Sequence, residues 1–238
     1  MKAVICGANG AMGKLLRLRL PDAYLVSLDG ENGVCRTFDE LGAIDADVII
    51  DFSHHSAIAD ILRYAKQNRM PVVVAATDHT QEEKQLIYAA ASEIPVFYSG
   101  NMSLGIAVLS QLVKAAVQSF PDADVEIVEV HHNRKADAPS GTAKMLFDEV
   151  KAVRPDAQPV YGRGGEGRRE VNDVGISAIR MGNVVGIHEV HICTASQTLT
   201  LRHEAHERGM FADGAVRAAE FLLEKDAGLY NMQQLLEA

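Results

Sequence analysis

Short hydrophobic runs alternate with stretches of helical periodicity through the first hundred residues. Apolar side chains from Ala57 to Ala65 recur at a spacing of three and four, which places one apolar stripe along a helix. The β-branched runs between such stretches predict buried strands at 2–6, 24–28, 47–52, 71–76 and 95–98. Alternation of strand and helix in this way is typical of an α/β fold with a doubly wound parallel sheet.

The pattern changes after about residue 103. A long apolar helix is predicted from Leu104 to about residue 120, and a last helix from Phe211 to about residue 225. Strand-like runs separated by polar segments are predicted at 125–132, 175–181, 184–192 and 198–202, with a turn at 181–183. The second half therefore predicts a smaller α+β domain with a mixed, largely antiparallel sheet.

Composition narrows the class of protein. The chain has 23 Lys and Arg against 32 Asp and Glu, a net charge of −9 that argues against nucleic acid as a partner. Three scattered cysteines without CxxC spacing support neither a disulfide framework nor a thiolate zinc site. No apolar run approaches the length of a membrane span. We therefore expect a cytoplasmic protein without membrane or nucleic-acid partners.

A glycine motif follows the first predicted strand and precedes a helix. Such glycines let backbone N–H groups at a helix start approach a pyrophosphate, and Asp29, 22 residues after Gly7, stands where an acid binds the ribose diol of a dinucleotide. A carboxylate there repels a 2′-phosphate and no Arg immediately follows it, so we expect NADH to be preferred over NADPH. The alternative is that the glycines serve only as turn residues. The motif reads Gly7-Ala8-Asn9-Gly10-Ala11-Met12-Gly13.

A second motif places several chemically active side chains between a strand and a helix. The strand 125–130 ends at His131 and His132, Lys135 lies in the following loop, and Ser140-Gly141-Thr142 opens a helix. A His can transfer a proton near neutral pH, and helix-start N–H groups bind a carboxylate. The alternative is a solvated turn with an ordinary Ser N-cap, which explains Ser140 but not the density of functional groups.

These motifs together resemble one family, the 4-hydroxy-tetrahydrodipicolinate reductases, also called dihydrodipicolinate reductases. The resemblance spans nearly the whole chain, and the segment 129–143 is its most specific part. The other matching segments are 7–13, 51–53, 99–103, 185–189 and 202–215.

The resemblance implies an NAD(P)H-dependent oxidoreductase that reduces 4-hydroxy-tetrahydrodipicolinate to tetrahydrodipicolinate, with loss of water, in diaminopimelate and lysine biosynthesis. It implies a Rossmann-like dinucleotide-binding domain formed by 1–102 and 209–238. Residues 103–208 would bind the dicarboxylate substrate and form a homotetramer.

Roles follow from the resemblance by position. His131 matches the general acid of the family, and Lys135 its companion, which stabilises developing negative charge or supplies the proton. The substrate-binding positions are His132, Lys135, Ser140, Gly141 and Thr142. The cofactor-binding positions are Gly7, Ala8, Asn9, Gly10, Ala11, Met12, Asp29, Ala75, Ala76, Thr77, Ser99, Gly100, Asn101 and Met102.

The chain departs from the family where a Gly-Thr-Thr-Gly loop is usual, because it has Ala75-Ala76-Thr77-Asp78. This change removes one hydroxyl and adds a charge near the nicotinamide. An additional pair, His54-His55, is assigned no catalytic part. Two alternatives to the reductase stay open: a dehydrogenase acting on another amino or imino dicarboxylate, and a non-catalytic NAD sensor.

Two further groupings invite other interpretations. The pairs His188/His191 and His203/His206 have i,i+3 spacing, which suits neither a metalloprotease helix nor one face of a strand, so we expect no metal site. Arg163, Arg168 and Arg169 lie in a glycine-rich segment at 161–172. This segment is either a solvated surface loop or one that closes over a dianionic substrate.

Overall fold

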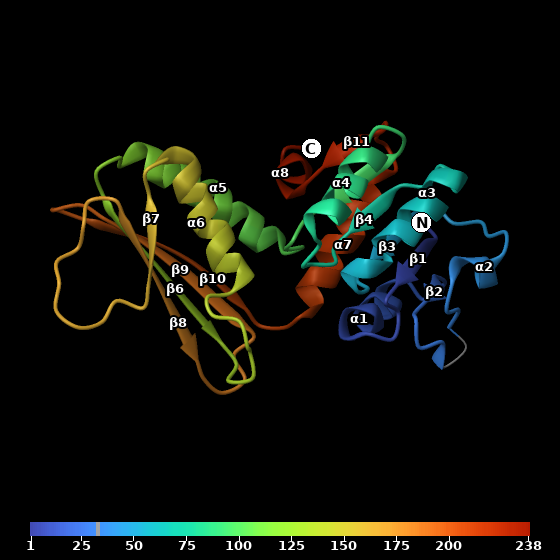
Figure 1. The fold of residues 1–238 in the computed structure, drawn as a ribbon, viewed down its shortest axis with the longest axis horizontal. Coiled ribbons are helices and arrows are strands. Elements are labelled where there is room, and N and C mark those ends of the chain that lie inside the picture. Colours follow the sequence, from blue (N-terminus) through green and yellow to red (C-terminus); the bar gives the residue numbers. More distant parts are fainter. Residues whose placement is uncertain (32–33) are drawn as a thin grey trace. The chain divides into compact units, whose positions relative to one another are not determined.

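The alternation of strand and helix at the start of the chain builds a parallel sheet in the computed structural model, which describes residues 1–31 and 34–238 (Figure 1). The chain divides into two units, each with its own hydrophobic core. Residues 1–103 and 208–238 form the first, here called the N-terminal unit, and residues 104–207 form the second, the central unit.

All neighbouring strands in the sheet of the N-terminal unit are parallel. Their order is β11-β5-β4-β3-β1-β2. Five strands occupy the predicted places and are the same length or shorter, whereas the three-residue β11 was not anticipated. Their bounds are β1 (Ala3–Cys6), β2 (Tyr24–Val26), β3 (Val48–Asp51), β4 (Val72–Val74), β5 (Pro95–Tyr98) and β11 (Gly228–Tyr230).

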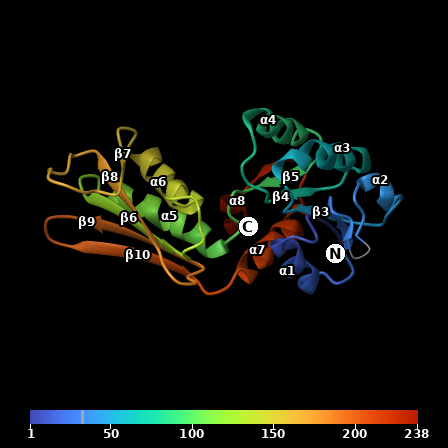
Figure 2. The same cartoon turned by 60° about the horizontal axis from the view of Figure 1, so that its bottom comes forward.

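Helices cover both faces of this sheet, which confirms the doubly wound, Rossmann-like fold (Figure 2). Helices α1 (Ala11–Arg19) and α7 (Gly209–Leu222) pack together on one face, and α3 (Ile58–Asn68) and α4 (Gln81–Ala90) on the other. The predicted apolar stripe of α3 is buried. The shorter elements are α2 (Phe38–Leu41), the 3₁₀ turn η2 (His55–Ala57) and α8 (Met232–Leu236).

The central unit is a mixed five-stranded sheet in the order β10-β9-β6-β8-β7, as the α+β prediction required. Strand β6 pairs antiparallel with β9 and parallel with β8; β9–β10 is antiparallel and β7–β8 parallel. The turn at 181–183 therefore connects two strands that flank β6 and do not pair with each other. The strands are β6 (Asp124–His131), β7 (Gln158–Tyr161), β8 (Asp173–Arg180), β9 (Gly186–Cys193) and β10 (Thr198–Ala205).

Two helices, α5 (Leu104–Ser119) and α6 (Gly141–Val153), cover one face of this second sheet. Alternate residues of β6, namely Val125, Ile127, Glu129 and His131, are buried, because successive side chains of a strand point to opposite faces. The apolar core thus gives way to polar groups at the end of β6. In the described ranges, no helix is long and apolar enough to cross a membrane.

Candidate active site

The glycine loop after β1 has two positions where a side chain does not fit. Gly7 has a φ of 75°, and a Cβ there would lie 2.6 Å from the carbonyl oxygen of Phe52. A Cβ on Gly13 would lie 2.2 Å from the carbonyl oxygen of Gly7. Gly10 is the N-cap of α1 and supplies no capping side chain, which leaves first-turn N–H groups for an anion. The loop therefore fits a pyrophosphate.

A cavity of about 660 Å³ opens beside this loop, a size usual for a cofactor or ligand site. Of the predicted cofactor positions, Gly7, Asn9, Gly10 and Asp29 line it. Its wall also includes residues that were not predicted to bind cofactor, among them Arg36, His54 and Arg63. The residues present thus suit a nucleotide.

Asp29 is held in place at the cavity by Asn9. The Asn9 side-chain amide donates to Asp29 Oδ1 at 2.6 Å, and this hydrogen bond lowers the pKa of Asp29. An ionised carboxylate here is suited to accept hydrogen bonds from a ribose diol. Arg36 lies nearby, since its guanidinium donates to the carbonyl oxygen of Asp29 at 3.4 Å and its side chain lies against Gly30.

Seven of the ten remaining predicted cofactor positions follow β4 and β5, whose carboxyl ends lie at the same sheet edge as the glycine loop. Ala75 and Ala76 are buried, and the Ala75 N–H donates to the carbonyl oxygen of Asp51 at 2.9 Å. The loop 99–102 is braced by the Ser99 hydroxyl, which donates to the carbonyl oxygen of Asn101 at 2.7 Å. These residues do not line the cavity, nor do Ala8, Ala11 and Met12.

A buried carboxyl group lies beneath the sheet edge at Asp51, the last residue of β3. Its Oδ1 accepts hydrogen bonds from the Ser53 N–H at 2.8 Å and the Ser53 hydroxyl at 2.5 Å. Its Oδ2 has no hydrogen-bond partner among the described residues. Burial raises the pKa of Asp51 to about 6, against the lowering effect of the Ser53 bonds.

The pair His54-His55 connects two loops at this edge. The two rings lie 4.1 Å apart, and His55 Nδ1 is 2.8 Å from a carboxylate oxygen of Glu83 in the first turn of α4. Glu83 also completes the capping box with Thr80. His54 borders the cavity, whereas His55 serves to tie η2 to α4.

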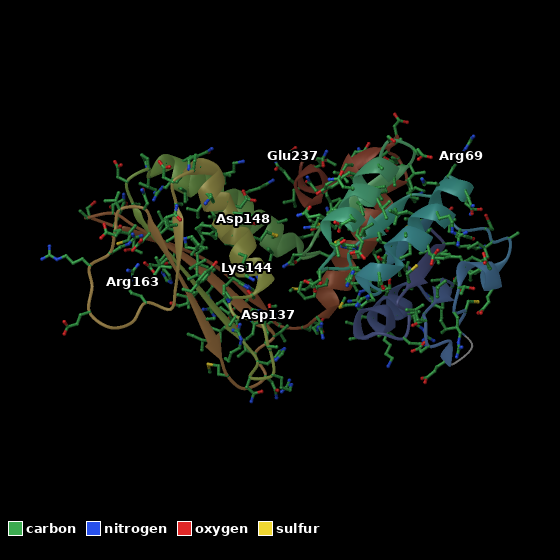
Figure 3. The ribbon with its side chains drawn as sticks, viewed as in Figure 1. Arg69, Asp137, Lys144, Asp148, Arg163 and Glu237 are labelled. Carbon is green, nitrogen blue, oxygen red and sulfur yellow. The ribbon has the colours of Figure 1, made fainter. Side chains whose placement is uncertain are left out.

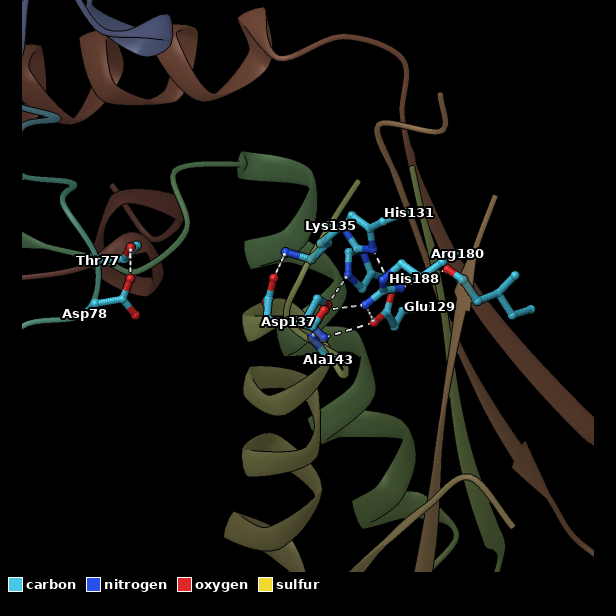
Figure 4. Close-up of polar contacts among 11 residues, drawn as sticks. Thr77, Asp78, Glu129, His131, Lys135, Asp137, Ala143, Arg180 and His188 are labelled. Atoms are coloured by element: carbon cyan, nitrogen blue, oxygen red, sulfur yellow. Dashed lines mark hydrogen bonds and ion pairs between the residues drawn. The ribbon is translucent and has the colours of Figure 1, made fainter. Parts of the chain in front are cut away.

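In the central unit, β6 brings His131 to a buried carboxylate that sequence reasoning did not single out (Figure 4). Glu129 Oε2 accepts a hydrogen bond from His131 Nδ1 at 2.5 Å, and both carboxylate oxygens accept from the Arg180 guanidinium at 2.8 Å. Burial alone would raise the pKa of Glu129, but the bonds from His131, Arg180 and the Ser140 N–H lower it to about 2. The carboxylate is therefore ionised at neutral pH.

Lys135 lies in the loop after β6, as predicted, and pairs with Asp137. Its Nζ is 2.8 Å from Asp137 Oδ1, and its backbone N–H donates to the carbonyl oxygen of His132 at 3.1 Å. The Arg180 guanidinium donates to the carbonyl oxygen of Asp137 at 2.6 Å. The same Arg180 thus contacts both Glu129 and the loop that carries the lysine.

Ser140 is the N-cap of α6, and its hydroxyl accepts from the Ala143 N–H at 3.2 Å. The same oxygen is 3.1 Å from Nε2 of His188 on β9. Burial, with help from nearby His131, lowers the pKa of His188 to about 3, so this ring is neutral at physiological pH. Gly141 and Thr142 form the start of α6, and a Cβ on Gly141 would meet open space.

In the structure, the predicted residues His131 and Ser140 therefore both donate hydrogen bonds to Glu129. The loop that carries Lys135 accepts a hydrogen bond from Arg180. Glu129, Arg180 and His188 were missed as functional groups. One signal was available for Glu129: it is two residues before His131 on a strand, and therefore on the same face. Nothing in the sequence indicates that β8 and β9 flank β6.

Comparison with known protein families decides the assignment of the chain. A model of the dihydrodipicolinate reductase N-terminus matches residues 1–102, and a model of the dihydrodipicolinate reductase C-terminus matches residues 105–236. The chain belongs to the dihydrodipicolinate reductase family.

Curated relatives agree with the family over their full length. A 4-hydroxy-tetrahydrodipicolinate reductase of Caldanaerobacter subterraneus subsp. tengcongensis is 40% identical, with 100% of this chain and 98% of the relative covered. The protein of that name from Alkaliphilus oremlandii is 39% identical, with 99% and 98% covered.

Solved structures share the fold at lower identity. Dipicolinate-bound dihydrodipicolinate reductase from Paenisporosarcina sp. TG-14 has a TM-score of 0.79 and 22% identity, with 97% of each chain covered. A probable dehydrogenase from Thermotoga maritima has a TM-score of 0.64 and 10% identity, with 99% of this chain and 92% of that one covered. At these identities the match describes the fold.

The loop 75–78 differs in sequence from the Gly-Thr-Thr-Gly loop usual in dihydrodipicolinate reductases. The backbone at Asp78 nevertheless has a conformation that glycine adopts easily. Asp78 stands where the resemblance places the second glycine, and it has a φ of 66°, in the left-handed region that glycine adopts at no steric cost. Its carboxylate accepts a hydrogen bond from the Thr77 hydroxyl at 3.1 Å (Figure 4). The remaining hydroxyl of this loop is therefore engaged by the added charge.

The arginine-rich segment lies away from the His131 end of the sheet. Arg163 pairs with Asp173 at 3.2 Å, and Arg169 pairs with Asp124 at 3.3 Å. Asp124 and Asp173 begin β6 and β8, so these guanidiniums are at the opposite end of the parallel strands from His131. Figure 3 shows Arg163 in this loop, well away from Asp137. These ion pairs favour the surface-loop interpretation over closure on the substrate.

Proposed function

We propose that this chain reduces 4-hydroxy-tetrahydrodipicolinate, the substrate in its relatives' name, to tetrahydrodipicolinate, as a step of diaminopimelate and lysine biosynthesis. The reaction consumes one NAD(P)H and one proton and releases water and NAD(P)⁺. The observation that carries the proposal is the convergence of His131 and the start of α6 on Glu129, with the Lys135 loop held by Arg180.

His131 acts as the general acid in this proposal. Its Nδ1–H is directed to Glu129, so Nε2 is the ring atom that can hold and release the proton. The bound dinucleotide supplies the hydride. Lys135 supplies a cation that stabilises the negative charge developing on the substrate. The ion pair with Asp137 holds the Lys135 ammonium group in position.

The substrate carboxylates bind at His132, Lys135 and the start of α6. Ser140, Gly141 and Thr142 form the start of α6, the end of a helix at which an anion is favoured. Ser140 itself is fixed by Glu129 and His188, which makes the site rigid before substrate arrives.

The N-terminal unit binds the dinucleotide through the glycine loop, Asp29, and the loops at 75–77 and 99–102. Asp29 accepts the ribose diol, which favours NADH. Arg36 offers a guanidinium beside Asp29 that can pair with a 2′-phosphate. NADPH can therefore also bind, although less tightly than NADH.

We expect Arg36→Met to raise the KM for NADPH about tenfold with little change for NADH, measured by steady-state kinetics with both cofactors.

The assay that tests the activity uses substrate made freshly from pyruvate and aspartate semialdehyde by the preceding synthase. Loss of nicotinamide absorbance is followed with NADH and with NADPH, for the unmodified protein, His131→Gln and Lys135→Met. A reductase should oxidise cofactor rapidly, and each variant should lose about 10²-fold or more in turnover while NADH binding is kept. Absence of oxidation with either cofactor, despite NADH binding, would favour the sensor or another imino dicarboxylate. His131→Gln within a fewfold of the unmodified rate would remove His131 as the acid.

The open face of the central sheet suits assembly into a homotetramer. Helices α5 and α6 cover one face, while the other carries half-buried Val128 and exposed Ile179 without a covering element in the described chain. The mass of the protein in solution, measured by sedimentation or light scattering, tests the tetramer.

The three free cysteines, Cys6, Cys35 and Cys193, suit a reducing cytoplasm, where thiols persist.

A further inference from the structure

Glu129 receives four hydrogen bonds from three different parts of the central unit. His131 on the same strand donates at 2.5 Å, Arg180 on β8 donates twice at 2.8 Å, and the Ser140 N–H at the start of α6 donates at 2.9 Å. The carboxylate is fully buried, with 0% of its surface exposed. Each oxygen therefore has two donors, and no water is needed to satisfy it.

The direction of the bond to His131 determines what that ring can do. An ionised carboxylate only accepts hydrogen bonds, so it requires a proton on Nδ1 and leaves Nε2 as the exchanging nitrogen. Gly186 on β9 lies near the opposite edge of the ring, where a Cβ would lie 3.1 Å from His131 Nε2, so glycine keeps this edge clear. Glu129 therefore holds the Nδ1 edge of the ring, while the lack of a side chain at Gly186 leaves room at Nε2.

Arg180 makes the buried charge tolerable. Two parallel N–H···O bonds pair the guanidinium with Glu129, which offsets the cost of desolvating a carboxylate. The same guanidinium donates to the carbonyl oxygen of Asp137, two residues after Lys135. Arg180 therefore links the Glu129 carboxylate to the loop that carries Lys135.

We propose that Glu129 is a positioning residue for the reductase reaction, which fixes the tautomer and orientation of His131 and sets the start of α6 at the same time. This proposal rests on the role of His131 given above. It predicts that Glu129 affects turnover through His131 rather than through cofactor binding, and that its carboxylate, not only its volume, is required.

The test compares Glu129→Gln with His131→Gln, the double variant and a matched control. Glu126→Gln is the control, because Glu126 lies on the same strand, half-buried on the opposite face. We expect Glu129→Gln to lower kcat about 10- to 100-fold, by analogy with the loss found when the hydrogen-bond partner of a metal-bound His is removed. The Kd for NADH should not change, and the double variant should be no slower than His131→Gln.

A spectroscopic readout tests the bond itself. A proton held between Nδ1 and a carboxylate in a 2.5 Å bond should give a far-downfield resonance in the ¹H NMR spectrum of the whole protein. The resonance should be present in the unmodified protein and in Glu126→Gln, and absent from His131→Gln and Glu129→Gln. This measurement does not depend on turnover.

The outcomes are distinguishable. Glu129→Gln with unchanged kcat, beside an impaired His131→Gln, overturns the proposal, as does a double variant clearly slower than His131→Gln. If His131→Gln retains its rate, the proposed function of His131 has failed, and with it the positioning role. If Glu129→Gln does not fold, the spectra of the unmodified protein and of His131→Gln decide. A downfield resonance that is lost in His131→Gln supports the hydrogen bond between His131 and Glu129. Absence of this resonance from the unmodified protein overturns the proposal.

Discussion

Each unit contains a fully buried carboxyl group at the end of a strand or near it, and the two behave in opposite ways. Asp51 in the N-terminal unit and Glu129 in the central unit both have 0% of their surface exposed. Yet the pKa of Asp51 is raised to about 6, whereas that of Glu129 is lowered to about 2. Burial alone therefore does not decide the charge of a carboxyl group.

The partners account for the difference. Asp51 has hydrogen bonds only from Ser53 and one oxygen without a partner among the described residues, so desolvation dominates. Glu129 has Arg180, His131 and the Ser140 N–H, which favour the charged form strongly enough to reverse the effect of burial. The negative charge of Glu129 next to the proposed acid is thus maintained, while that of Asp51 beneath the proposed cofactor-binding loops is disfavoured.

Removing Arg180 should reduce the difference between the two carboxyl groups and have the largest effect on stability. Arg180→Met leaves Glu129 buried without its cation, which costs about 3–5 kcal/mol in the stability of the central unit. The pKa of Glu129 should move up toward that of Asp51. Hydrogen exchange of the β6 amides measures the loss. Arg163→Met, which removes an exposed ion pair, is the control and should cost less than about 1 kcal/mol; equal effects would contradict the account.

Asp51→Asn should remove a pH dependence from the N-terminal unit. Because the folded-state pKa of Asp51 is raised, the folded state binds its proton more tightly. The stabilisation is complete below the unfolded pKa of 3.8 and is lost as pH rises through about 6. From pH 4 to pH 7 this loss is about 2–3 kcal/mol. Exchange of the β3 amides should show it in the unmodified protein but not in Asp51→Asn; parallel pH profiles would refute it.

His188 should give the central unit the opposite dependence. Its folded-state pKa is lowered to about 3, so its contribution to stability is present above the unfolded value of 6.5 and is lost as pH falls toward 3. Between pH 7 and pH 5 the expected loss is about 2 kcal/mol. His188→Gln should flatten this part of the profile, measured by exchange of the β9 amides. A profile that keeps its slope would show that another group titrates.

The smallest expected effect concerns the space around His131. In Gly186→Ala, the added methyl group would lie 3.1 Å from His131 Nε2, so the ring must move by a few tenths of an ångström. Turnover should fall a fewfold, equivalent to about 1 kcal/mol, with cofactor binding unchanged. Gly167→Ala, where the Cβ meets open space, is the control. Unchanged kcat in Gly186→Ala would show that the space beside His131 Nε2 is not required for turnover.

Much of the fold could be predicted because it depends on local periodicity. Five strands of the first sheet and the apolar stripe of α3 were placed correctly, since both patterns repeat within a few residues. The strands β11 and β7 were missed, because Gly-Leu-Tyr and Gln-Pro-Val-Tyr each hold only two consecutive hydrophobic residues, whereas the predicted strands of the first sheet hold three or more. The motif at 131–142 identified the candidate site because its residues are close in sequence.

What the sequence by itself determined is the class of each sheet, the glycine loop after β1, and the run from His131 to Thr142 that marks the family. Only the tertiary structure decided which side chains meet. Arg180 reaches Glu129 because β8 pairs with β6 across 51 residues, His188 reaches Ser140 across 48, and Arg36 folds back to Asp29. Charge and position at the site depend on these long-range contacts, because a buried group takes its protonation state from whatever surrounds it in space.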